Sequence, residues 1–280
     1  MGAWSSSREV TSKSWGVLKD NSYLFAFPIL MFVLSLIPIA VLGLPALYFF
    51  ASNQNWIAAA FAIVAVFAAQ AVTTLLQGGL VASVDKELEG QDSSLGDGMS
   101  RAFAHTGQLL AWSAIVTVVS LLFALVRGNG QGNVVGVLLR NIVAAAGEVL
   151  WTLITFFVVP FIVLEDQSPI AAIKSSASLF RKKWGTQLAG SVRIGGLIVL
   201  LIVLPAVVVL VVGFVLLVSD AIVLGIPLVV VGVLVLMIGM LLSSAMRTVF
   251  SVALYRYAST GAVSAQFTEA ELESAVRVKA

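Results

Sequence analysis

The sequence predicts an all-α, polytopic integral membrane protein with about six transmembrane helices and short amphipathic helices at the membrane interface. Three observations support this class. Hydrophobic residues make up 60% of the 280 residues, against roughly 45–50% in soluble chains. Charged residues make up only 11%, and the mean hydropathy is +1.05. Several apolar runs also reach the length of about 20 residues that a helix needs to cross a hydrocarbon core of about 30 Å.

Six apolar runs, bounded by charged or polar segments, are the predicted spans. They are Tyr23 to Phe50, Trp56 to Val84, Leu109 to Val126, a span within Val134 to Leu164, Ile194 to Val218, and Ala221 to Met246, with a start at Pro227 if Gly225 and Pro227 belong to a turn. Asp220 is the only charge between the fifth and sixth runs. A helix from Leu197 to Leu242 would be about 69 Å long, more than twice the core thickness, so we expect the chain to turn back near Asp220.

The distribution of positive charge predicts the orientation. Of the 16 Lys and Arg residues, all but Arg127 and Arg140 fall in the two tails or in the connections that follow the second and fourth spans. Because cytoplasmic loops are rich in Lys and Arg, we expect a multi-pass protein of the cell membrane with both termini cytoplasmic. We treat residues 1–280 as one membrane domain, with tails at 1–22 and 247–280 around a six-helix region at 23–246.

The connection after the fourth span contains a predicted interfacial helix. Ser168 can cap it, and Pro169 suits its first position. Ile170, Ile173, Ala177, Phe180 and Trp184 form one apolar stripe. We therefore predict that the helix binds anionic lipid headgroups through Lys174, Arg181, Lys182, Lys183 and Trp184. The alternative is that these cations only anchor the helix on the cytoplasmic side.

The two long cytoplasmic connections resemble each other, which suggests an internal repeat. Leu88-Glu89-Gly90-Gln91 corresponds to Leu164-Glu165-Asp166-Gln167, and each is followed by a serine pair or a Ser-Pro pair. The repeated unit would be a short cytoplasmic helix, a helix outward and a helix back. The alternative is that segments entering a membrane share a common composition.

Three ionisable residues lie within or beside spans, where charges are functional candidates. Glu148 and Arg140 are expected near the outer boundary and Arg193 near the cytoplasmic one, so Glu148 and Arg193 should not pair. Gly225, Gly232 and Gly239 recur every seven residues on the sixth span and form a candidate helix-packing seam. This seam could serve packing within the chain or a homo-oligomer.

Other residue types argue against catalysis. The chain has no cysteine and one histidine, His105, which we expect to be a solvated surface residue without a role. No aqueous segment reaches the roughly 40 residues that a small domain needs, and no phosphate loop or hydrolase motif is present. We therefore predict no enzyme activity, metal or cofactor, and the net charge of +2 gives no reason to expect nucleic acid as a partner.

The segment from Val158 to Trp184 resembles a known pattern, in which an apolar helix containing Pro ends in Glu and a Ser-Pro pair starts a basic helix. It is similar to uncharacterised bacterial and archaeal six-helix membrane proteins of unknown function. It is also similar to the membrane domain that precedes the catalytic domain of some glycerophosphodiester phosphodiesterases. This chain lacks a phosphodiesterase domain, so the resemblance implies a stand-alone membrane domain and transfers no catalytic residue.

These observations favour a non-enzymatic membrane protein that interacts with anionic lipid or organises other membrane proteins, as a homo-oligomer or with a membrane-protein partner. A small transporter or channel is the first alternative, and it would need a polar pathway. An intramembrane lipid-processing enzyme is the second and least favoured alternative, because no cluster of Asp, His or Ser at one depth is visible.

Overall fold

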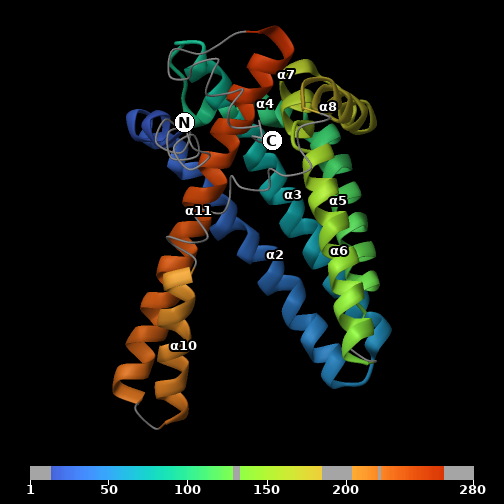
Figure 1. Ribbon diagram of the computed structural model, residues 1–280, viewed down its shortest axis with the longest axis vertical. Helices are drawn as coiled ribbons and strands as arrows, with labels where there is room; N and C mark the ends of the chain where they lie inside the picture. Colours follow the sequence, from blue (N-terminus) through green and yellow to red (C-terminus); the bar gives the residue numbers. More distant parts are fainter. Residues whose placement is uncertain (1–13, 129–132, 185–203, 220–221, 262–280) are drawn as a thin grey trace. The chain divides into compact units, whose positions relative to one another are not determined.

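The computed structural model describes residues 14–128, 133–184, 204–219 and 222–261, and all regular structure in these ranges is helical. Residues 14–20 are helical, and the later elements are η1 (Ser22–Phe25), α2 (Ala26–Ala51), α3 (Asn55–Leu88), α4 (Leu95–Ala104), α5 (Thr106–Arg127), α6 (Val134–Ile154), α7 (Val158–Glu165), α8 (Pro169–Trp184), α10 (Leu204–Val218) and α11 (Ile222–Thr260) (Figure 1). Short helices thus precede the first, third and fifth predicted spans.

Five helical stretches in the described residues are long and apolar enough to cross a membrane. They are Ser22–Ala51, Asn55–Leu88, Thr106–Arg127, Val135–Glu165 and Val223–Thr260. They correspond to the predicted first, second, third, fourth and sixth spans. The end of the predicted fifth span is α10, which has 15 residues, and residues 194–203 lie outside the described part. The described part of the chain is therefore all-helical and contains five candidate spans, as expected of a multi-pass membrane protein.

The chain divides into two compact units, of which the second contains residues Ile29–Lys183. Within it α3 contacts α4, α5 and α7, and α5 contacts α6 and α7. Figure 1 shows α4, α7 and α8 at one end of this bundle, and the α2–α3 and α5–α6 connections at the other. Both long connections predicted to be cytoplasmic therefore lie at the same end of the unit.

The first unit comprises Met1–Pro28 and Trp184–Ala280. In it α10 and α11 lie side by side as a hairpin, and η1 contacts α11 (Figure 1). The helix α11 starts before Pro227 and extends past Met246 to Thr260. Pro227 removes only one backbone hydrogen bond near the start of the helix. Arg247 and Thr248 lower the local hydropathy without ending the helix, because the backbone bonds of a helix do not depend on apolar side chains.

The fourth span is broken between Ile154, where α6 ends, and Val158, where α7 begins. Pro160 explains the break, because proline has no N–H and its ring clashes with the carbonyl four residues earlier. Ser176 of α8, which is fully buried, replaces the lost partners. Its hydroxyl donates to the carbonyl of Ile154 at 2.6 Å and accepts from the N–H of Phe157 at 3.1 Å. Ser176 thus ties α8 to the broken span.

Candidate functional site

The helix α8 has three distinct faces. Ala172 and Ser176 are fully buried and form the face that packs on the protein. Lys174 and Arg181 are exposed and seven residues apart, so they share the opposite face. The predicted apolar stripe lies on the flank between the two, where Ile170 remains 63% exposed. A helix packed on a bundle with cations outward and an apolar flank has the geometry of an interfacial helix.

The cations of α8 have no acidic residue on their own helix to neutralise them. Lys174, Arg181 and Lys182 are exposed, and none forms an ion pair with another described residue. Lys183 and Trp184 are the last residues of α8, and their side chains lie outside the described part of the structure. The structure therefore places three of the five predicted headgroup residues on an exposed, positively charged surface.

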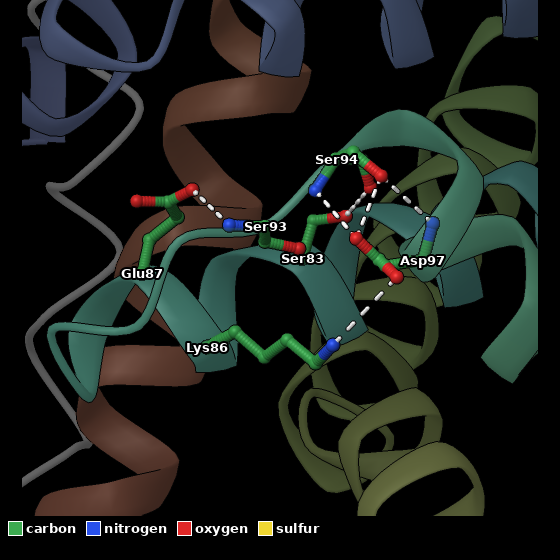
Figure 2. A network of polar contacts seen from close by, with 6 residues as sticks. All are labelled: Ser83, Lys86, Glu87, Ser93, Ser94 and Asp97. Carbon is green, nitrogen blue, oxygen red and sulfur yellow. Dashed lines mark hydrogen bonds and ion pairs between the residues drawn. The ribbon is translucent and has the colours of Figure 1, made fainter.

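The start of α4, at the same end of the unit, is fixed by a polar network that Figure 2 shows. Ser94 and Asp97 form a reciprocal capping box: Asp97 N–H donates to the Ser94 hydroxyl at 3.2 Å, and Ser94 N–H donates to the Asp97 carboxylate at 3.1 Å. Ser93 N–H donates to Glu87 at 3.2 Å. These contacts set the direction in which the chain leaves α3.

The charges of this network stabilise one another. The Ser94 hydroxyl donates to Asp97 at 2.6 Å, and Lys86 Nζ lies 4.0 Å from the second carboxylate oxygen. The hydrogen bond from Ser94, together with the positive charge of Lys86, lowers the pKa of Asp97 below its usual value of 3.8. Asp97 is therefore negatively charged at neutral pH, and its carboxylate holds the start of α4 in place.

A second cluster of polar residues joins the junction of α4 and α5 to α7 and to the α7–α8 turn. Arg101 Nε donates to the carbonyl of Val163 at 3.0 Å. His105 Nε2 lies 3.2 Å from Asp166 Oδ1, and Gln108 Nε2 donates to the same oxygen at 3.2 Å. Asp166 adopts a left-handed conformation with φ of 56° at the end of α7. We call His105, Gln108 and Asp166 the latch, because they connect segments about 60 residues apart in sequence.

The expectation that His105 is a solvated surface residue is wrong. His105 is only 3% exposed, and its Nδ1 lies 2.8 Å from the carbonyl of Arg101. The residue closes α4 and precedes α5, so its burial follows from the packing of that junction on α3 and α7. Nothing in the sequence pairs His105 with Asp166, which lies 61 positions further along the chain.

The predicted intramembrane charges gather at the α5–α6 hairpin. Arg127 at the end of α5 pairs with Glu148 of α6 at 2.5 Å, and both side chains are partly exposed. The guanidinium carbon of Arg140 lies 4.0 Å from the position that a Cβ on Gly128 would occupy. A cation there faces the carbonyl end of α5, which is favourable. Arg193 lies outside the described residues.

The predicted glycine seam lies in α11, where Gly225, Gly232 and Gly239 are all buried. A Cβ on Gly232 would lie 2.7 Å from Leu210 Cγ of α10, and one on Gly213 of α10 would lie 2.9 Å from the backbone of Val229. The two helices approach so closely that a methyl group at either glycine would overlap the partner helix. Gly232 therefore serves the contact between α10 and α11 within the chain.

Residues 59–265 match a family described as a family of unknown function, DUF6159. The match covers most of the chain. The protein belongs to this family. No curated protein and no solved structure matches the chain. The DUF6159 match agrees with the predicted resemblance to membrane proteins of unknown function and gives no link to glycerophosphodiester phosphodiesterases.

Proposed function

We propose that this DUF6159 protein is a non-enzymatic integral membrane protein whose helix α8 binds anionic lipid headgroups. The observation that carries the proposal is the exposed face of α8 with Lys174, Arg181 and Lys182, which no acidic residue of the helix offsets. Phosphate is the most abundant anionic group at a membrane surface, and each Lys or Arg near such a surface contributes about 1 kcal/mol. By holding lipid against this end of the bundle, α8 would also organise neighbouring membrane proteins.

The proposal includes a topology. We place six spans in the membrane, with α10 and the preceding residues as the fifth, and both termini in the cytoplasm of the cell. This orientation follows from the charge bias, because α4 and α8 carry most of the basic residues of unit Ile29–Lys183 and share one end of it. We also retain the internal repeat, since a capping serine starts both helices, Ser94 for α4 and Ser168 for α8.

A pair of matched double variants tests the role of α8. Lys174→Gln/Arg181→Gln removes two exposed cations from α8, and Lys19→Gln/Arg247→Gln removes two exposed cations elsewhere. Native mass spectrometry of the full-length protein, equilibrated with equal amounts of phosphatidylglycerol and phosphatidylcholine, gives the ratio of the two bound lipids. We expect this ratio to fall up to about 30-fold in the α8 variant, since two cations contribute about 2 kcal/mol.

The control variant should keep the parental lipid ratio. If both variants lower the ratio equally, the cations act only through total charge, and α8 is not a binding site. A ratio that neither variant changes would also refute the proposal. Adding free inorganic phosphate as a competitor separates recognition of the phosphate group from recognition of the whole lipid.

The transporter hypothesis depends on Glu148 among the described residues. Its carboxylate is paired with Arg127, the last residue of α5, so an arginine already balances its charge. A carboxylate that is held by an arginine is less available as a proton or ion site than an unpaired one. The described geometry therefore favours lipid binding over transport.

A further inference from the structure

The latch places hydrogen-bond acceptors at both nitrogens of the His105 ring. Nδ1 lies 2.8 Å from the carbonyl oxygen of Arg101, and Nε2 lies 3.2 Å from the carboxylate oxygen of Asp166. The Arg101 carbonyl belongs to the last turn of α4, where carbonyls have no partner within the helix. A carbonyl and a carboxylate can only accept, so both ring nitrogens must donate for both contacts to be favourable.

Only the protonated imidazolium ring carries two N–H groups. A neutral ring has one, so its second nitrogen would direct a lone pair at an oxygen 2.8 or 3.2 Å away. Loss of the proton therefore turns one of the two contacts from attractive to repulsive. Because His105 is 3% exposed, water has little access to relieve that repulsion.

The other charged groups around the latch act in both directions. Asp166 attracts the proton, and the Gln108 amide donates to the same carboxylate oxygen and so supports its negative charge. The guanidinium of Arg101 opposes a second positive charge, although its Nε is directed to the Val163 carbonyl. Lys86 is engaged with Asp97, and Gln167 with Glu165, so these groups have partners of their own.

We propose that protonation of His105 controls the latch. The protonated ring holds the α7–α8 turn on the α4–α5 junction, and the neutral ring releases that turn. With the neutral ring only one of the two contacts stays attractive, so the latched population falls as the ring loses its proton. Histidine is the side chain that changes charge between about pH 5 and 8. The inference goes beyond lipid binding by α8 and does not depend on it.

The composition of the chain makes this proposal testable without ambiguity. His105 is the only histidine and there is no cysteine. Histidine labelled with ¹⁵N in the full-length protein therefore gives the signals of one imidazole, which report how many ring nitrogens are protonated. Two introduced cysteines at the exposed positions Ala104 and Ile170 take spin labels on the two sides of the latch.

We expect loss of the ring proton and widening of the label-to-label distance distribution to occur over the same pH range. In Asp166→Asn the label distances should no longer follow the ring proton. Asparagine tolerates the left-handed conformation of this position, and the site is exposed, so the variant should fold. Asp92→Asn, another exposed acid at this end of the unit, should behave like the parent.

Label distances that stay constant while the ring loses its proton would overturn the proposal. An unchanged pH response in Asp166→Asn would also overturn it, because the response would then come from another group. A ring that carries one proton at pH 5 would contradict the double donation on which the inference rests.

Discussion

Ser176 shows at the scale of one residue how a buried polar group can hold a membrane protein together. Its hydroxyl serves both sides of the break in the fourth span, at the carbonyl of Ile154 and at the N–H of Phe157. Unpaired backbone groups in an apolar setting are costly, and water is scarce there. The same hydroxyl orients α8, so the basic face of the helix depends on a residue that carries no charge.

We predict that Ser176→Ala lowers the free energy of unfolding by about 1–3 kcal/mol, because two backbone groups lose their partner. The neighbouring Ser178→Ala, at a half-buried position of the same helix, should have a smaller effect. Unfolding by sodium dodecyl sulfate in mixed micelles measures the difference, and hydrogen exchange at the Phe157 amide should accelerate only in Ser176→Ala. Equal effects of the two substitutions would show that the bridge adds no stability.

The hairpin of α10 and α11 illustrates how helices meet at the scale of elements. Lipid tails are as apolar as leucine, so helices associate in membranes through close packing of small residues. Gly213 and Gly232 supply that closeness from opposite helices. Gly232, the middle glycine of the seven-residue period in α11, thus serves helix packing within the chain.

Gly232→Ala should destabilise the protein by about 1–3 kcal/mol, because its Cβ would overlap Leu210. Gly43→Ala is the matched control: Gly43 lies inside α2, and a Cβ there meets nothing within 4 Å. Adding Leu210→Ala to Gly232→Ala removes the overlapping atoms and should restore part of the loss. Thermal unfolding in detergent checks these three variants and Leu210→Ala alone. A double variant less stable than the sum of the two single effects would contradict the overlap.

The sequence predicted the elements better than their contacts. Hydropathy located α2, α3, α5 and the broken fourth span, because a helix in lipid must be long and apolar. It could not reveal the break at Pro160 or the length of α11, since both depend on backbone bonding rather than on apolarity. It also misplaced His105, because burial of that ring depends on how the α4–α5 junction packs on α3 and α7, segments distant in sequence.

The candidate site was predicted in part for the same reason. The cations of α8 could be placed on one helix from their spacing, and Lys174, Arg181 and Lys182 are exposed as a solvated basic face requires. Spacing says nothing about Ser176, which looks like any small polar residue in a helix. Its role depends on the break in a different element.

The topology of the whole molecule can be tested directly by cysteine labelling. The natural chain has no cysteine, so a single introduced cysteine is the only one that can react. We predict that Gln54→Cys, at the exposed α2–α3 turn, reacts with an impermeant maleimide added to intact cells. Asp92→Cys, at the exposed α3–α4 connection, should react only after permeabilisation, since α3 separates the two. A reversed pattern would refute the orientation, and equal reactivity of both would show that α3 does not cross the membrane.

The length of α11 has a consequence for how the protein is made. Its 39 residues extend about 58 Å, almost twice the hydrocarbon core. Glycines apart, the side chains before Ala245 are largely exposed, whereas nearly all those from Thr248 to Ala258 are buried. The first half can enter the bilayer as soon as it leaves the ribosome, because lipid suits its side chains. The second half is suited to protein contacts instead, and η1 of the same unit contacts α11. This half is therefore completed by contact with an N-terminal segment that was synthesised long before it.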